Sequence, residues 1–197
     1  MAIRIEERFQ VQAPRERVWA FLLDPHQVAA CAPGAQLLEV VDERTFKGNV
    51  RVKVGPITVS YGGQAQLQEV DEEAGLVRML AQGRETAGSG SARATMVARI
   101  QPLGGGATEV QVEADIDVAG RLMQFGRGMV QDVTRQLFHQ FVACLKERLE
   151  GPAQAGAPPA ASEPISGVAL AKEALRSSLG RLVRRPRPEG EEKGPRR

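Results

Sequence analysis

Residues 107–149 read ATEVQVEADIDVAGRLMQFGRGMVQDVTRQLFHQFVACLKERL, and the spacing of their apolar residues changes at Gly120. Before Gly120, apolar and polar residues alternate, which indicates a β-strand with one buried face. From Arg121 to Leu149 the apolar residues recur every three or four positions, which indicates an amphipathic helix. Such a helix spans about 43 Å at about 1.5 Å per residue, enough to cross a whole sheet. The sequence therefore predicts a last strand that leads directly into a long helix.

The same alternation recurs upstream, between turn signals such as Gly55-Pro56 and Gly104–Gly106. Strands are expected near residues 3–12, 35–42, 45–54, 57–68, 76–83, 91–100 and 109–118. Because short turns join neighbouring strands, we expect them to form an antiparallel sheet with one face in water.

Two short helices are expected between the first and the second strand. Pro14 suits a first helical turn, and the apolar spacing continues to Leu23 before Asp24-Pro25 ends the segment. A second helix runs through residues 28–30 and stops at Pro33-Gly34. The expected fold class is α+β, with one seven-stranded antiparallel sheet curled around the long C-terminal helix.

Small residues occupy many positions on the apolar side of these strands. They are Gly48, Gly63, Ala65, Ala92, Ala94, Ala98 and Ala114. Either the long helix packs very close to the sheet at these positions, or a cavity remains between them. Close packing is the commoner arrangement in protein interiors, whereas a persistent apolar cavity is best explained by a ligand.

Composition narrows the classes of protein further. The chain has 197 residues, 26 Lys or Arg, 24 Asp or Glu and a formal net charge of +2, which does not favour nucleic acid as the main partner. No stretch of about 20 apolar residues could span a bilayer, and the N-terminus does not resemble a secretory signal. Cys31 and Cys144 are 113 positions apart, and we expect both to be reduced in a cytoplasmic protein.

The C-terminal residues form a separate, basic tail. Residues 151–163 are rich in Ala, Pro and Gly and predict a linker, whereas residues 186–197 are charged, rich in Pro and predicted to be disordered. Between them, residues 164–185 predict an amphipathic helix, and the chain from Pro164 onward carries nine Lys or Arg and four Asp or Glu, a net of +5. Its apolar face and the flanking cations are Ile165, Val168, Leu175, Leu179, Leu182 and Val183, with Lys172 and Arg176.

This pattern predicts a helix that lies in the interface of an anionic membrane, with its basic side chains reaching the lipid head groups. Peripheral association with the inner face of the plasma membrane is the expected location. The same amphipathic pattern would also suit packing on the chain's own domain or on a partner protein.

Five blocks of the sequence resemble one known family. They are FQVQAPRERVWAFLLDP at 9–25, PG at 33–34, VKVGPI at 52–57, GRETAGSG at 83–90 and GRLMQFG at 120–126. Together they resemble the CoxG family of carbon monoxide dehydrogenase proteins, part of the SRPBCC superfamily of START-like and Bet v 1-like helix-grip proteins. The resemblance covers about residues 1–150 and implies the helix-grip fold. It also implies an accessory role beside carbon monoxide dehydrogenase or a related molybdenum hydroxylase, with a lipid quinone such as menaquinone or ubiquinone in a cavity.

Candidate ligand contacts are the flexible or aromatic side chains expected to point inward near the open end of the fold. They are Trp19, Leu22, Tyr61, Met96, Phe125 and Met129. Methionine and flat aromatic groups can adapt to a planar ring with a flexible tail, and the Tyr61 hydroxyl could donate a hydrogen bond to a quinone carbonyl. The alternative for each of these residues is a place in the ordinary core.

No catalytic or metal-binding constellation is visible, so we expect a protein without enzymatic activity. His26 lies in an expected turn and His139 on the polar side of the long helix, where surface roles are expected. Two alternatives stay open. One is an assembly factor that docks on the dehydrogenase without a small ligand. The other is an enzyme of the cyclase or hydrolase type, which would need Glu69, Arg78 or Asp42 to face inward through a shift of one residue in strand register.

Overall fold

The computed structural model describes residues 1–151. Apart from Gly151, the predicted linker, membrane helix and disordered tail lie outside the described residues. Within the described part, no helix is long and apolar enough to cross a membrane.

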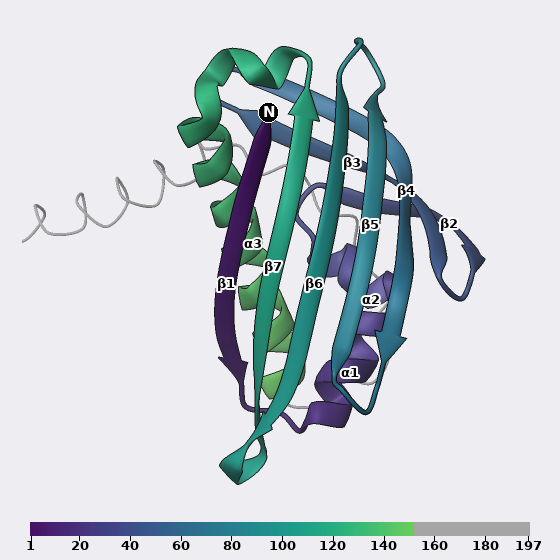
Figure 1. The fold of residues 1–197 in the computed structure, drawn as a ribbon, viewed down its shortest axis with the longest axis vertical. Helices are drawn as coiled ribbons and strands as arrows, with labels where there is room; N and C mark the ends of the chain where they lie inside the picture. The colour runs from purple at the N-terminus through teal and green to yellow at the C-terminus, as the bar shows by residue number, and fades with distance from the viewer. Residues whose placement is uncertain (152–197) are drawn as a thin grey trace, which may run out of the picture. The chain divides into compact units, whose positions relative to one another are not determined.

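Seven antiparallel strands form one sheet in the order β1-β7-β6-β5-β4-β3-β2 (Figure 1). They are β1 (Ala2–Val11), β2 (Ala35–Asp42), β3 (Thr45–Val54), β4 (Ile57–Asp71), β5 (Leu76–Glu85), β6 (Ser91–Leu103) and β7 (Ala107–Ala119). Strand β1 pairs with β7, so the first and the last strand in sequence lie side by side, and the rest is a meander. The number, order and antiparallel direction of the predicted strands are confirmed.

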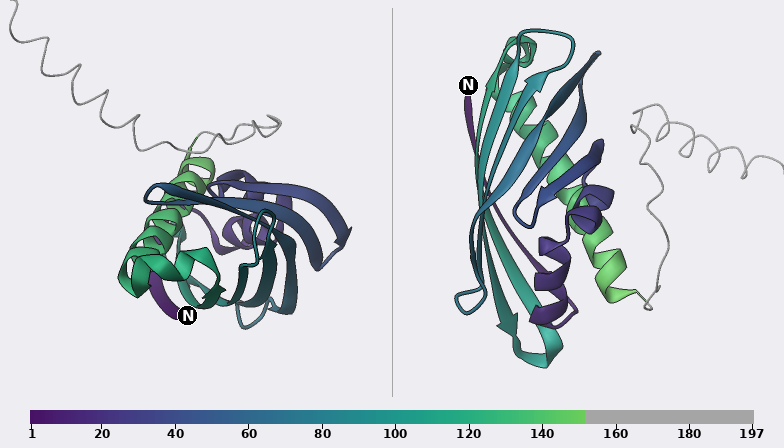
Figure 2. Two further views of the ribbon diagram at one scale, coloured as in Figure 1. Left: turned by 90° about the horizontal axis from the view of Figure 1, so that it is seen from above. Right: turned by 90° about the vertical axis from the view of Figure 1, so that its right-hand side faces the viewer.

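Three α-helices lie on one side of the sheet, which curls around them (Figures 1 and 2). Helices α1 (Arg15–Leu23) and α2 (Pro25–Cys31) connect β1 to β2, and α3 (Gly126–Glu150) follows β7. Helix α2 begins earlier than predicted because the Asp24 side chain accepts hydrogen bonds from the backbone N–H groups of His26 and Gln27, with Pro25 in the first turn.

The long C-terminal helix is not continuous from Arg121, as the sequence had indicated. Residues 121–125 form a 3₁₀ turn, η2 (Arg121–Phe125), and the α-helix starts only at Gly126. Gly126 has a φ of 74°, which interrupts regular helix geometry and is accessible to glycine at little cost. The apolar spacing runs through both pieces, so periodicity alone could not reveal the break.

The main core lies where α1 and the C-terminal half of α3 meet the sheet. Its fully buried members include Phe21 from α1, Ile100 from β6, Val110 from β7 and Leu145 from α3. Beside it, the buried Thr108 hydroxyl donates a hydrogen bond of 2.7 Å to the Ala13 carbonyl. The region where sheet and helices are most tightly joined is therefore this end of the domain.

A disulfide joins Cys31, at the end of α2, to Cys144 on α3. The expectation of two reduced cysteines is thus wrong. Docking of α2 against α3 brings the two Cα atoms to 5.4 Å although the residues are 113 positions apart. That distance lies within the range that a disulfide can bridge, and sequence spacing gives no information about it.

We expect Leu145→Ala to lower the free energy of unfolding by about 2–5 kcal/mol, because it leaves a cavity in a fully buried site. Leu103→Ala is a control with the same chemical change at a side chain that is 36% exposed, and it should cost about 0.5 kcal/mol. Urea titrations of both variants measure these losses. Equal losses would contradict the position of the core described above.

Candidate functional site

Small residues on four neighbouring strands face one another across the concave side of the sheet. The pairing registers align Gly48 on β3, Gly63 on β4, Gly83 on β5 and Ala92 on β6 in one row. The next row aligns Phe46, Ala65, Ala81 and Ala94. With one exception these residues have side chains no larger than a methyl group, so the space next to them stays unfilled.

The result is a cavity of about 460 Å³ between these strands and the first two helices. Its apolar walls include Leu22 and Leu23 of α1, Val28 and Ala29 of α2, Phe46 of β3 and Met79 of β5. Small-molecule sites usually have volumes of about 300–1,000 Å³ and mainly apolar walls with a few polar groups. Volume and lining are therefore those of a site for an apolar ligand.

The Tyr61 side chain also lines this cavity and supplies an unpaired polar group. The residue is buried, and its hydroxyl has no hydrogen-bond partner among the described residues. A buried polar group without a partner costs about 1–3 kcal/mol, so a partner oxygen from a bound molecule would stabilise the site. Burial and, to a smaller extent, the charge of Glu85 raise the pKa of the Tyr61 phenol, against the opposing effect of Arg121. Tyr61 is thus a neutral hydrogen-bond donor at physiological pH.

Glu85 lies directly opposite Tyr61 in the β4–β5 register and faces the interior. Its side chain is 1% exposed. The Arg121 Nε donates to its carboxylate at 2.8 Å, the same guanidinium makes a second, shorter contact, and the Gly90 N–H donates at 3.2 Å. This ion pair ties the start of η2 to the β5–β6 turn and sets a buried charge beside the tyrosine.

The sequence analysis missed Glu85, although a signal was present. Val77, Met79 and Gly83 have the same parity as Glu85 along β5, so the inward pattern leads to a carboxylate. The predicted strand ended at residue 83, two residues too early.

Of the six predicted ligand contacts, Leu22 and Tyr61 line the cavity. Trp19 is instead buried in the main core, with the Arg15 guanidinium 5.6 Å from its ring centroid. Met96 packs against the main core too. The structure does not bring these four residues into one site.

The last two candidates also lie away from the cavity lining. Phe125 packs against the buried cluster around Val54 and Tyr61. The Met129 side chain is 46% exposed, so the expectation that it points inward is wrong. Neighbouring helical residues point about 100° apart, and it is Val130 that is buried against the sheet.

The small inward residues divide between the two arrangements that the sequence left open. Gly48, Gly63, Ala65, Ala92 and Ala94 line the cavity. Ala114 is close-packed with Ile3, Ile5 and Val130, and Ala98 packs against the main core. A cavity and close packing thus both occur, on different halves of the same sheet.

The polar residues considered for catalysis lie on the outer surface. Glu69 and Arg78 form an exposed ion pair at 3.1 Å, and Asp42 is exposed. His139 is exposed, with its Nε2 3.8 Å from a Glu7 carboxylate oxygen. Within residues 1–151 there is no group of three or more His, Cys, Asp or Glu side chains that could hold a metal ion.

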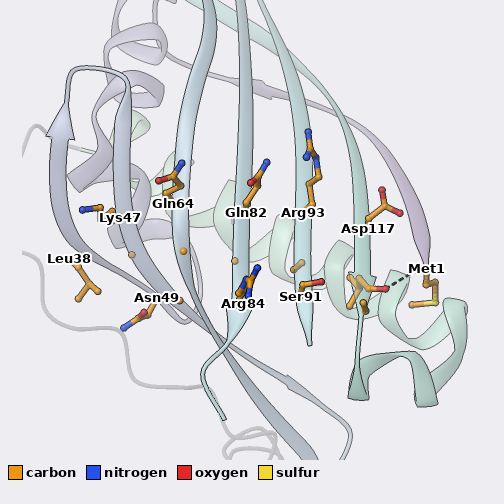
Figure 3. A pocket seen from close by; sticks show the side chains of 17 residues that line it. Met1, Leu38, Lys47, Asn49, Gln64, Gln82, Arg84, Ser91, Arg93 and Asp117 are labelled. Carbon is orange, nitrogen blue, oxygen red and sulfur yellow. Dashed lines mark hydrogen bonds between the residues drawn. The ribbon is translucent and has the colours of Figure 1, made fainter. Parts of the chain in front are cut away.

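A second hollow, of about 740 Å³, lies over the outward-facing side chains next to the glycine row (Figure 3). Gln64, Gln82, Arg84, Arg93 and Asp117 are among its lining side chains, and all five are exposed. This polar, water-accessible surface differs from the cavity on the concave side. The thin glycine backbone is common to both, because the strand pleat sends side chains alternately to the two faces.

Titration of Tyr61 checks the polar end of the cavity, and the protein has one tyrosine. The ultraviolet absorbance of the phenolate should report a pKa above about 10, the value of an exposed tyrosine. Because the pKa is raised in the folded state, stability should be complete below about pH 10 and fall as the pH rises through the folded-state pKa. Glu85→Gln should lower the pKa by removing a negative charge, whereas Glu16→Gln on the surface of α1 should not change it. An unchanged pKa in Glu85→Gln would contradict the proximity of the two groups.

Comparisons with known proteins agree with this architecture. A conserved protein from Geobacillus kaustophilus is similar over 75% of this chain and 95% of its own, with a TM-score of 0.68 and 18% identity. The Zhui aromatase/cyclase from Streptomyces sp. R1128 is similar over 79% and 98%, with a TM-score of 0.59 and 16% identity. A START superfamily protein from Mycobacterium smegmatis is similar over 75% and 97%, with a TM-score of 0.54 and 14% identity.

At these identities the likenesses concern the fold, which is the helix-grip fold of START-like and Bet v 1-like proteins. No curated protein matches the sequence. A family model does match, over residues 8–150, and it describes CoxG, the G-type subunit of carbon monoxide dehydrogenase. Because this match spans nearly all of the described domain, the chain belongs to the CoxG family.

Proposed function

We propose that this protein is a non-enzymatic accessory protein of carbon monoxide dehydrogenase, or of a related molybdenum hydroxylase, and that it carries a lipid quinone. The single observation that supports this most is the apolar cavity with the unpartnered Tyr61 hydroxyl. Membership of the CoxG family supports the accessory role. The likeness to an aromatase/cyclase concerns the fold alone and gives no reason to propose an enzyme.

The chemistry of a quinone matches what the cavity offers. A quinone ring is flat and apolar except for its carbonyl oxygens, which accept hydrogen bonds. The neutral Tyr61 hydroxyl can donate to one carbonyl, while the ring contacts side chains such as Phe46 and Met79. A cavity of about 460 Å³ is suited to the ring and the first part of an isoprenoid tail, with the remainder of a long tail extending beyond it.

The C-terminal tail supplies the proposed link to the membrane. Residues 164–185, outside the described part of the chain, combine an apolar stripe with basic side chains. Each such cation near an anionic surface contributes about 1 kcal/mol, so several together give substantial binding. In this proposal the tail keeps the protein at the cytoplasmic leaflet, where a soluble dehydrogenase and a membrane-soluble electron acceptor can meet.

Organic extraction of the full-length protein from cells that contain lipid quinones, followed by mass spectrometry, should find a near-stoichiometric quinone. Ala94→Leu places a larger side chain in the cavity and should remove most of it. Thr95→Leu is the matched control, because the neighbouring residue points to the outer face of β6. Tyr61→Phe should weaken binding of added quinone by about threefold to tenfold, the usual effect of one lost hydrogen bond. If the wild-type protein yields no apolar molecule above background, the carrier function is wrong and the docking factor becomes the better interpretation.

Truncation after Gly151 should abolish flotation with vesicles that contain phosphatidylglycerol, because it removes the whole basic tail. The double variant Leu175→Asp, Leu179→Asp keeps every cation but breaks the apolar stripe, and it should float much less than the wild type. Unchanged flotation of the truncated protein would contradict membrane binding by the tail.

A further inference from the structure

Helix α2 forms one wall of the cavity. Three of its residues, Pro25, Val28 and Ala29, line the cavity, and Ala32 follows directly after its last turn. The helix has only seven residues, and helices this short are not stable without support from the rest of the protein. Whether the cavity stays closed on this side therefore depends on what holds α2 in place.

Cys31 is the only residue of α2 that is buried. The hydrogen bonds at the two ends of the helix are local, from Asp24 to the first turn and from the Ala32 N–H to the Val28 carbonyl. They stabilise the helix itself but do not attach it to the sheet or to α3. The covalent bond of Cys31 to Cys144 is thus the strongest attachment of this wall.

The other end of the bond lies on the most firmly held element of the domain. Cys144 is half-buried on α3, next to Leu145, which is completely buried in the main core. A short helix with one buried residue is therefore fastened to a helix that cannot move without breaking the core.

We propose that the Cys31–Cys144 disulfide is a reversible thiol–disulfide site that reacts with dithiol reductants and controls access to the cavity. The inference concerns the cavity itself and applies to any apolar ligand that binds there. Lasting disulfides are uncommon in reducing compartments, and those that form there are usually redox-active, which suits a protein at the cytoplasmic membrane surface.

The exchange is balanced with a dithiol as the reductant. One thiolate of the dithiol attacks the Sγ of Cys144, the less buried of the two cysteines, so the S–S bond breaks and the Sγ of Cys31 leaves as a thiolate that takes up a proton. The second thiol then attacks the mixed disulfide and releases Cys144, which is also protonated. The dithiol is oxidised to a disulfide, and two electrons and two protons are transferred to the cysteine pair.

Once the bond is broken, α2 is held only by contacts of half-buried side chains. Local openings of such weakly held segments occur far more often than global unfolding. Each opening of α2 exposes the cavity and allows a ligand to leave or enter. The oxidised protein should retain its ligand, and the reduced protein should exchange it quickly.

The test uses the full-length protein and the neutral apolar dye N-phenyl-1-naphthylamine, so it does not depend on whether a quinone is the natural ligand. The release rate of the dye is measured by stopped-flow fluorescence before and after treatment with dithiothreitol, with reduction confirmed from the protein mass. We expect reduction to speed release by about tenfold or more, and reoxidation to restore slow release. Hydrogen exchange should become faster in residues 26–32 and stay unchanged in β6 and β7.

The double variant Cys31→Ser, Cys144→Ser serves as the control. It should release the dye as fast as the reduced wild type and be insensitive to dithiothreitol. Equal release rates of the oxidised and reduced wild type would overturn the proposal. So would a loss of hydrogen-exchange protection throughout β6 and β7, because the bond would then be a general stabiliser of the fold and not a control of the cavity. If the double variant does not fold, the reversible reduction of the wild type still decides the outcome.

Discussion

The registers of β3 to β6 are the constraint on which the rest of the structure depends. They align Gly48, Gly63, Gly83 and Ala92 on the concave face, so four strands present almost no side-chain volume there. Protein interiors are normally close-packed, and the other half of the sheet obeys this rule where Ala114 packs against α3. The sheet therefore combines a filled half, which supplies stability, with a hollow half, which holds the cavity.

The polar groups of the cavity are few and have unequal roles. Glu85 is buried, but Arg121 and the Gly90 N–H satisfy its carboxylate, so it acts as a structural tie between β5 and η2. Tyr61, on the neighbouring strand, is left without a partner among the described residues. Burial and the adjacent negative charge keep its phenol protonated. A single hydrogen-bond donor in an apolar cavity favours ligands with one well-placed oxygen over strongly polar ones.

Sequence reasoning located the fold more accurately than the site. It predicted Leu22 and Tyr61 on the cavity wall, but it also selected Trp19, Met96, Phe125 and Met129, which lie elsewhere. Inward parity tells which face a side chain belongs to, but not which of its neighbours leave space beside it. The disulfide was out of reach for a similar reason, because α2 and α3 meet only after each has docked on the sheet.

The sequence by itself determined the order of strands and helices and the buried face of each strand. These features follow from periods of two and of about 3.6 residues, which are local properties of the chain. The tertiary structure alone decided three others: the half of the sheet that stays hollow, the contact of Glu85 with Arg121, and the bond between Cys31 and Cys144. Each of these depends on how far-separated segments approach one another, and that distance is set by strand register and helix docking, which no local pattern encodes.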